Sequence, residues 1–313
     1  MTKSTKIILI TAGVLVGLGL IIAGVALGIN KIKNNVFGFN NTNSSSSYEE
    51  KSTEIKDDFE DIDITEVSSD VNIVATSKSN AYVEYTDSDT YHHEITVKGD
   101  TLRIEYKNDQ NSVVKIGFML PIFGISEDDE SFPVTVYLPE KEYGELNVAI
   151  VSGDTTVDPM SFEKIKIDSV SGEVKLNGCD LEEKFDASAV SGSITCEKLN
   201  AGDININTTS GTVSMSDTTA KNADIQTISG KVNLNSFSAS SVDIDTTSGD
   251  VILDAFESKD TEINTVSGDV RGTLKGDYDI SYDTVSGDSD ISGSVSGGYR
   301  FEVDTTSGDL TLK

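Results

Sequence analysis

Tryptophan is absent from this sequence, cysteine and histidine each occur only twice, and basic residues are few. The chain of 313 residues holds 24 lysines and arginines against 53 aspartates and glutamates. Residues 1–33 contain four of the lysines and no acidic residue, which leaves 20 basic residues against 53 acids in the remainder. A body with this charge repels nucleic acid and offers no basic patch for phosphate, so we expect no nucleic-acid partner.

The scarce cysteines and histidines offer little chemistry. If the repeats described below stack in register, Leu176 rather than Cys179 lies beside Cys196, whereas a disulfide needs Cα atoms within about 7 Å. We therefore predict two buried free thiols, with a disulfide as the alternative. His92 and His93 are adjacent in a strand-like stretch, and adjacent strand residues point to opposite faces. We predict a surface pair without a catalytic or metal-binding role.

A Ser-Gly pair recurs through the second half of the chain, from Ser152 to Ser307, at a nearly constant interval. A fixed period near 20 is typical of a solenoid, whose repeats bury their apolar faces only by stacking on neighbours. Glycine suits a corner because it reaches positive φ without steric cost. The predicted corner glycines are Gly153, Gly172, Gly192, Gly211, Gly230, Gly249, Gly268, Gly287 and Gly308.

Strand patterns flank each Ser-Gly pair. Apolar residues lie three and five positions after the serine, as in Val232 and Leu234, and a second alternating run precedes the pair, as in Val242 and Ile244. A period of two marks a strand, and the β-branched residues disfavour a helix. The predicted fold is an all-β, single-stranded parallel β-helix with rungs of about 19 residues, whose handedness the pattern leaves open.

A long apolar run opens the chain. Residues 7–29 are uncharged and long enough to cross a bilayer of about 30 Å, whereas a cleaved signal peptide, the alternative, has a shorter apolar region. We predict a short cytoplasmic tail at 1–6 and a single-pass helix at 7–29 in the cell membrane, with the β-helix outside the cytoplasm. Glycines at small-xxx-small spacing would let two such helices form a homodimer. They are Gly13, Gly17, Gly24 and Gly28.

The rest of the chain divides by composition. Residues 30–51 read as a flexible Ser/Asn-rich stalk, 52–148 as an N-terminal β region that caps the solenoid, and 149–313 as the regular repeats. The apolar segment 116–125 is either a loop folded over the solenoid end or an exposed patch for lipid or protein. We expect the final strand, DLTLK, at the open end, where its charges discourage pairing; a docking surface for another protomer is the alternative.

In the last four repeats an aspartate follows the Ser-Gly pair, where stacking would align the carboxylates. Such a column repels itself unless it is screened or bridged by cations. Thr212 and Lys231 occupy this position in other repeats, which favours a solvated face over a calcium ladder. The four residues are Asp250, Asp269, Asp288 and Asp309.

Enzyme activity is not expected. Polysaccharide-cleaving β-helices use clustered carboxylates beside a groove that long inserted loops and aromatic residues wall. The nearly constant spacing of the Ser-Gly pairs leaves no room for such loops, and tryptophan is absent. We therefore predict no catalytic residue and no cofactor, and carbohydrate-active chemistry is the weakest alternative.

The whole arrangement resembles a bacterial domain-of-unknown-function family known as putative adhesins. The resemblance rests on the entry strands at Ile62–Thr76, the segment Val134–Val148 and the TVSGDV-type repeats from Ser152 to Leu312. It implies a cell-surface or envelope protein, often from low-GC Gram-positive bacteria, with some relatives encoded beside envelope-stress regulators. It implies no catalytic residues.

These observations predict a membrane-anchored cell-surface β-solenoid that serves as an adhesin-like binding or structural module, with a protein or glycan surface as its partner. The alternative is an accessory regulator of envelope-stress sensing. That regulator would contact another membrane protein through the apolar helix or through residues 116–125.

Overall fold

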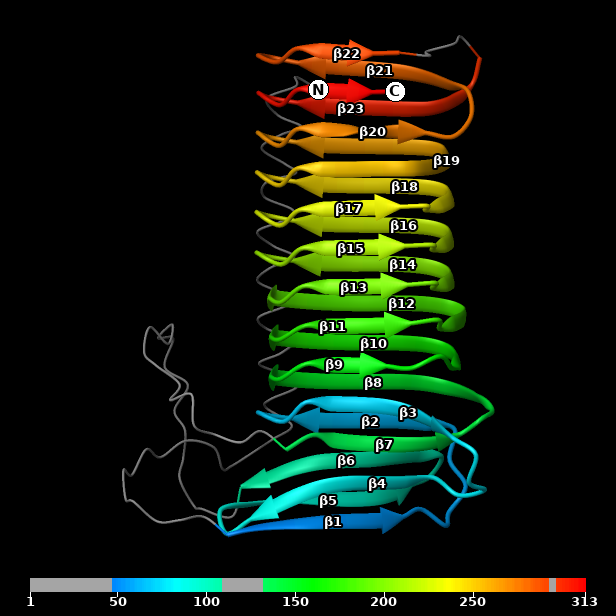
Figure 1. Ribbon diagram of the computed structural model, residues 1–313, viewed down its shortest axis with the longest axis vertical. Coiled ribbons are helices and arrows are strands. Elements are labelled where there is room, and N and C mark those ends of the chain that lie inside the picture. The colour runs from blue at the N-terminus through cyan, green and yellow to red at the C-terminus, as the bar shows by residue number, and fades with distance from the viewer. Residues whose placement is uncertain (1–46, 109–131, 293–296) are drawn as a thin grey trace.

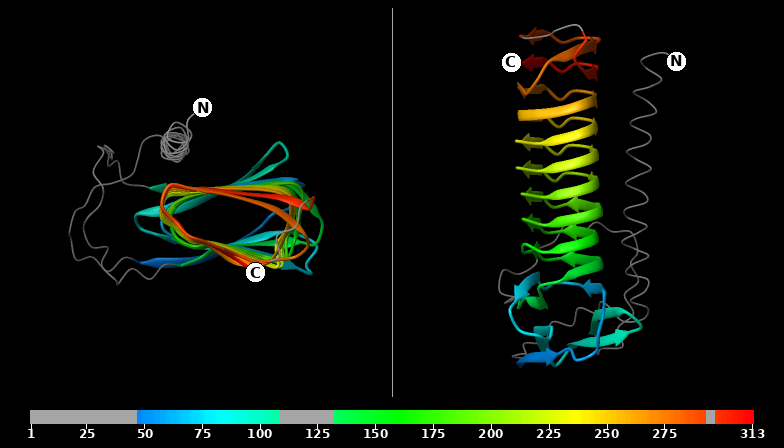
Figure 2. Two further views of the ribbon diagram at one scale, coloured as in Figure 1. Left: turned by 90° about the horizontal axis from the view of Figure 1, so that it is seen from above. Right: turned by 90° about the vertical axis from the view of Figure 1, so that its right-hand side faces the viewer.

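The computed structural model describes residues 47–108, 132–292 and 297–313, and these residues form a rod of stacked β-strands without a helix. Each turn of the chain gives one strand to each of two faces (Figure 1). Viewed along the rod, the turns superimpose as a flattened ring with two long sides (Figure 2). The predicted all-β solenoid, with its short and regular rungs, is thus confirmed.

The two faces are named A and B. In spatial order along the rod, face A contains β1 (Tyr48–Glu54), β4 (Tyr82–Ser88), β7 (Val134–Pro139), β3 (Val71–Thr76), β9 (Thr155–Val157), β11 (Val174–Asn177), β13 (Ile194–Glu197), β15 (Val213–Ser216), β17 (Val232–Asn235), the start of β19 (Val251–Thr265), β20 (Val270–Leu274), β24 (Leu310–Leu312) and β22 (Ser289–Ile291). Face B contains β5 (Tyr91–Lys98), β6 (Thr101–Asn108), β2 (Asp61–Glu66), β8 (Glu142–Ser152), β10 (Ser161–Ser171), β12 (Asp180–Ser191), β14 (Asn200–Thr208), β16 (Thr219–Thr227), β18 (Ser238–Thr246), the end of β19, β23 (Tyr299–Thr305) and β21 (Tyr278–Thr284).

The core consists of columns of equivalent apolar residues. Val213 pairs in parallel with Val232, which pairs in turn with Val251, and all three are buried. Stacking in register removes each apolar side chain from water, at about 25 cal/mol per Å² of buried surface. Leu176 lies beside Cys196 as predicted, and both cysteines are buried free thiols.

The corner glycines are required by close approach more than by positive φ. Only Gly153 and Gly172 of the nine have positive φ, so the predicted reason is wrong for the other seven. From Gly172 onward, a Cβ would lie 1.8–2.2 Å from the carbonyl oxygen of the corner glycine in the adjacent rung. Because real Cβ atoms do not approach so closely, the glycines let successive corners stack directly on one another.

Left-handed backbone occurs at the opposite corner, seven residues after the serine. There Lys198, Asp217, Ser236 and Ala255 have φ between 50° and 52°, and Gly178 has φ 62°. Non-glycine residues rarely adopt this conformation, which costs roughly 1–2 kcal/mol per residue. The strand segments that follow these five turns pair in parallel with the adjacent rungs.

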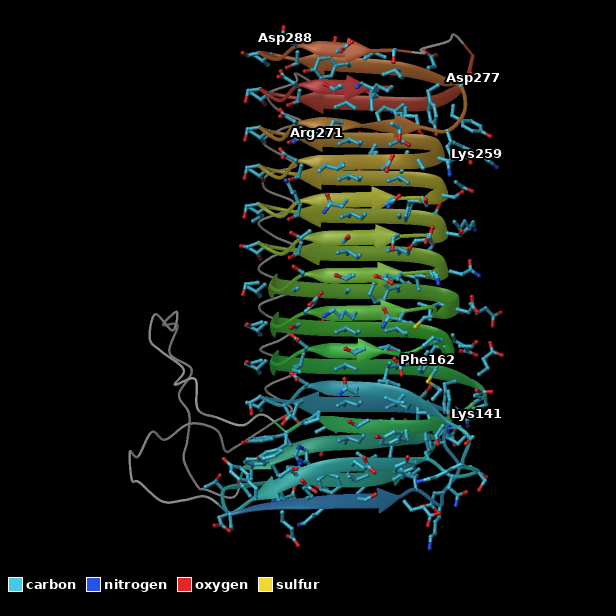
Figure 3. All side chains as sticks on the ribbon, in the orientation of Figure 1. Lys141, Phe162, Lys259, Arg271, Asp277 and Asp288 are labelled. Carbon is cyan, nitrogen blue, oxygen red and sulfur yellow. The ribbon has the colours of Figure 1, made fainter. Side chains whose placement is uncertain are left out.

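The C-terminal rungs do not stack in sequence order. β23 and β24 lie between the rung of β19 and β20 and the rung of β21 and β22. Figure 1 shows β21 and β22 at the end of the rod, and Figure 3 places Asp288 on this terminal rung. The prediction that DLTLK forms the open end is therefore wrong, because β24 pairs on both sides.

The N-terminal end carries a cap that includes antiparallel strands. The rung of β2 and β3 lies between the rung of β8 and β9 and that of β6 and β7. Strand β5 then pairs antiparallel with β6, while β4 pairs antiparallel with β7 and β1. We call β1, β4 and β5 the cap.

Several predictions concern residues outside the described ranges: the helix at 7–29, its glycines and the apolar segment 116–125. Strand β1 begins at Tyr48, inside the range predicted as stalk. Within the described ranges, no helix is long and apolar enough to span a membrane.

Candidate functional site

The outer side of face B between β16 and β23 carries a dense group of carboxylates. In these strands the inward positions are apolar, so the alternation points the acidic residues outward. Asp224, Asp243, Glu262 and Glu302 form one column across four paired strands. We call the whole group the acidic face. It comprises Asp224, Asp243, Asp245, Asp260, Glu262, Glu302 and Asp304.

Basic residues balance only one edge of the acidic face. Arg300 on β23 pairs with Asp260 at 2.7 Å and Glu262 at 3.4 Å, and also with Glu302. Towards β18, Asp245 accepts a hydrogen bond from the Asn264 amide at 3.1 Å. Because paired strands lie about 4.8 Å apart, the stacked carboxylates interact strongly with one another.

Two carboxyl groups of the acidic face have raised pKa values, and both lie on β18. Loss of surrounding water, together with the charges of Asp245 and Asp224, raises the pKa of Asp243 to about 7. Partial burial also raises the pKa of Asp245, although the hydrogen bond from Asn264 opposes this shift. The centre of the acidic face therefore holds a strong negative potential near neutral pH.

Removing this charge should stabilise the fold at high pH. Because the folded pKa of Asp243 lies above the unfolded value of 3.8, the resulting destabilisation is absent below pH 3.8 and complete above pH 7. We expect Asp243→Asn to raise the free energy of unfolding at pH 8 by less than about 1 kcal/mol, since Asp243 keeps enough contact with solvent for its charge to be screened. Urea denaturation at pH 4 and pH 8 tests this, and an equal effect at both values would contradict it.

Three of the four aspartates that follow Ser-Gly in the last repeats accept a backbone N–H from another rung. Asp250 accepts the N–H of Asp269 at 3.3 Å, Asp269 accepts that of Asp309 at 3.0 Å, and Asp309 accepts that of Asp288 at 2.9 Å. Arg271 also lies 2.9 Å from Asp250. These carboxylates join successive rungs, and their order follows the spatial order of the rungs.

A second contact at the same corner was not recognised in the sequence. A buried threonine three residues before the glycine accepts the glycine N–H at 2.9–3.1 Å in five rungs. The repeated Thr-x-Ser-Gly pattern is the signal that could have revealed it. The threonines are Thr208, Thr227, Thr246, Thr265 and Thr305.

The histidine prediction is wrong in part. His92 and His93 do point to opposite faces, as adjacent residues of a strand do. They pair with Lys107 and Tyr106 on β6. His93 is nevertheless buried, not on the surface, and its ring contacts Asp87 at 2.9 Å and Glu66 at 3.0 Å. The described ranges hold no group of three or more His, Cys, Asp or Glu side chains that could bind a metal ion.

The surface depressions are shallow. One, of about 350 Å³, lies at the corner of successive rungs and is lined by three acidic residues and three uncharged ones: Glu142, Asp180, Glu182, Ser161, Leu181 and Asn200. Its carboxylates line a cavity open to solvent, which gives no enclosed site that excludes water. The acidic face is accordingly the strongest candidate for a functional surface.

A family comparison identifies the architecture. The model of the family described as Toastrack DUF4097 matches residues 59–184 and 180–313, which together cover most of the chain. The chain belongs to the Toastrack DUF4097 family. No curated protein matches it.

Solved structures of three Parabacteroides proteins are similar to this chain. A putative adhesin from Parabacteroides distasonis is 16% identical, with a TM-score of 0.54, and the match covers 86% of this chain and 98% of that one. A putative adhesin from Parabacteroides merdae is 13% identical with a TM-score of 0.48, covering 85% and 96%. A putative lipid binding protein from Parabacteroides distasonis is 18% identical with a TM-score of 0.46, covering 84% and 96%. At 16% identity, the likeness to the first of these structures is one of fold alone.

Proposed function

We propose that this chain is an adhesin-like binding module, held at the cell surface by the apolar helix at 7–29, and that it binds a cationic protein surface through the acidic face. The observation that carries the proposal is the stacking of carboxylates over four paired strands. A rigid rod presents them at fixed spacing, so a partner with clustered lysines or arginines can contact several at once.

Two further observations support this function. The pKa of Asp243 is raised to about 7 by loss of water and by the neighbouring carboxylates, and a cationic partner would relieve that repulsion. The Parabacteroides distasonis protein with the TM-score of 0.54, which shares the fold, is described as a putative adhesin. Binding through an exposed face needs no deep pocket.

A charge-matched comparison tests the proposal. We expect Asp243→Asn, Asp245→Asn and Glu262→Gln, combined in the full-length chain, to weaken binding of an oligolysine peptide by at least tenfold at pH 8 and 0.15 M salt, where Asp243 is ionised. The loss follows because three adjacent charges leave the contact surface. Surface plasmon resonance at increasing salt measures the affinity.

The control removes three exposed carboxylates outside the acidic face: Asp57, Asp58 and Glu60, just before β2. Replacing these with amides changes the net charge by the same amount and should weaken binding by less than threefold. Equal losses in the two triple variants would show that only net charge matters and would overturn the proposal. A second assay measures how intact cells that display the chain adhere to a surface coated with basic protein. Cells that display the acidic-face variant should adhere less.

A further inference from the structure

Three chain segments meet at a buried ionic cluster where the cap joins the solenoid. Glu66 ends β2 of the first rung, Asp87 lies on β4 and His93 lies on β5. All three side chains are buried, with relative exposures of 1%, 6% and 6%. Strand β4 belongs to face A while β2 and β5 belong to face B, so the cluster also links the two faces.

Both ring nitrogens of His93 contact carboxylates. Nδ1 lies 2.9 Å from Asp87 and Nε2 lies 3.0 Å from Glu66. Carboxylates accept hydrogen bonds, so the ring donates from both nitrogens only as an imidazolium. The contacts therefore fit a protonated histidine that carries one positive charge between two negative ones.

The backbone and a lysine hold the carboxylates in place. Glu66 accepts the N–H groups of Val67 at 2.7 Å and Ser68 at 3.3 Å. Asp87 accepts the backbone N–H of His93 at 2.9 Å and the Lys51 ammonium from β1 at 3.0 Å. Every strand of the cap thus contributes to the cluster.

The surroundings of the ring add no competing charge in direct contact. Tyr85 on β4, Tyr91 on β5 and Tyr106 on β6 pack around it, at ring-centre distances of 5.3, 6.0 and 6.0 Å. On the other side of β2, Glu66 lies opposite the uncharged Ile150 of β8. The further charge close by is Glu49, 3.2 Å from Lys51. The aromatic rings exclude water and strengthen the ionic contacts.

We propose that Glu66, Asp87 and His93 form a pH-sensitive latch that holds the cap on the first rung of the solenoid. Protonated His93 joins the two carboxylates and closes the latch. When the ring loses its proton, one nitrogen can no longer donate, and two buried carboxylates face each other across a neutral ring. The latch then opens, which loosens β4 and β5 and leaves the rungs beyond β8 intact.

The pKa shifts of His93 and Asp87 determine how the stability of the latch depends on pH. Burial lowers the pKa of His93, but the hydrogen bonds and charges of Glu66 and Asp87 outweigh it, so the pKa is raised above 6.5. Stabilisation by His93 is therefore complete below pH 6.5 and is lost as the pH rises through the folded pKa. Burial raises the pKa of Asp87, but His93 and Lys51 outweigh it and the pKa falls below 3.8, so its contribution is lost only in stronger acid.

Histidine NMR on the full-length chain tests the latch directly, since the sequence has only two histidines. We expect one imidazole to titrate well above pH 6.5 and its signal to vanish in His93→Gln but not in His92→Gln. In Glu66→Gln, which keeps the side-chain shape but removes the charge, that titration should move down by at least one pH unit. Glu94→Gln is the matched control, because Glu94 is the exposed neighbour of His93 on β5.

Hydrogen exchange then reads out the opening. Each pKa unit corresponds to a tenfold change in an equilibrium constant. Between pH 6 and pH 9, after correction for intrinsic exchange, protection in β4 and β5 should fall at least tenfold while β12 to β16 stay protected. In Glu66→Gln this dependence should be lost. A His93 signal that titrates at or below pH 6.5, equal shifts in Glu66→Gln and Glu94→Gln, or unchanged cap protection would each overturn the latch.

Discussion

Replacing Gly230 with alanine is expected to lower the free energy of unfolding by more than about 2 kcal/mol, because overpacking costs roughly 1–3 kcal/mol even where side chains can move. Here the added Cβ would lie 1.9 Å from the Gly211 carbonyl oxygen and 2.8 Å from the Thr227 hydroxyl. Gly211 lies in the short corner between β14 and β15, and both strands pair with neighbouring rungs on either side, so the carbonyl cannot move aside without disturbing the stack. Urea denaturation monitored by far-UV circular dichroism measures the loss.

The sign of the stability change shows whether the corner is crowded, because alanine has the opposite effect at an uncrowded glycine. In an open strand, alanine would stabilise by roughly 0.5–1 kcal/mol relative to glycine. Ser229→Ala at the neighbouring exposed position removes only a hydroxyl 3.3 Å from the Thr209 carbonyl, so it should change stability by less than about 0.5 kcal/mol. A Gly230→Ala variant as stable as Ser229→Ala would show that successive corners do not stack closely.

Much of the fold could be predicted because the same alternation of apolar and polar residues recurs around each Ser-Gly pair. Apolar residues at a period of two, repeated in every rung, determine both the strands and their parallel register. The neighbours predicted for Cys196 follow directly from that register. The left-handed residues at the opposite corner escaped notice because Lys198, Asp217, Ser236 and Ala255 carry no shared residue type.

The buried histidine shows what strand alternation leaves open. Alternation placed His92 and His93 on opposite faces, but it does not say which face another strand covers. His93 is buried because β4 brings Asp87 over it and β2 brings Glu66 from another rung. Those partners lie 6 and 27 residues away in the sequence, and no local pattern connects them.

The acidic face was visible only as a general excess of acid. In the sequence, the aspartates after Ser-Gly stand out because they share one repeat position. Three of those carboxylates instead accept backbone N–H groups, and a separate group of carboxylates lies on the outer side of face B. Reading the strand before each Ser-Gly for outward residues would have aligned Asp224, Asp243 and Glu262.

The order of the C-terminal rungs follows from hydrophobicity rather than from chain order. The nested rung has four apolar side chains whose relative exposure is at most 1%: Phe301, Val303, Leu310 and Leu312. The equivalent positions of the terminal rung include Ile280, Tyr282 and Ile291, which remain half-buried. Placing the more apolar rung inside removes more surface from water, and Tyr282 still donates its hydroxyl hydrogen to the Gly308 carbonyl at 2.5 Å.

Two paired positions distinguish the nested order from a sequential one. We expect Phe301→Ala to lower the free energy of unfolding by about 3–5 kcal/mol, as for other fully buried phenylalanines. Its register partner Ile280 on β21 is half-buried at the end of the rod, so Ile280→Ala should cost roughly 1 kcal/mol. Urea denaturation of both variants gives the comparison.

Sequential stacking would reverse the ranking. Ile280 would then lie between two rungs and Phe301 on the open end, so Ile280→Ala would be the more damaging change. Hydrogen exchange supplies the independent measurement, since amides of β23 and β24, bonded on both sides, should be protected longer than those of β21 and β22. Faster exchange in β23 than in β21 would contradict the nested order, because a strand enclosed by two neighbours cannot open before the one that covers it.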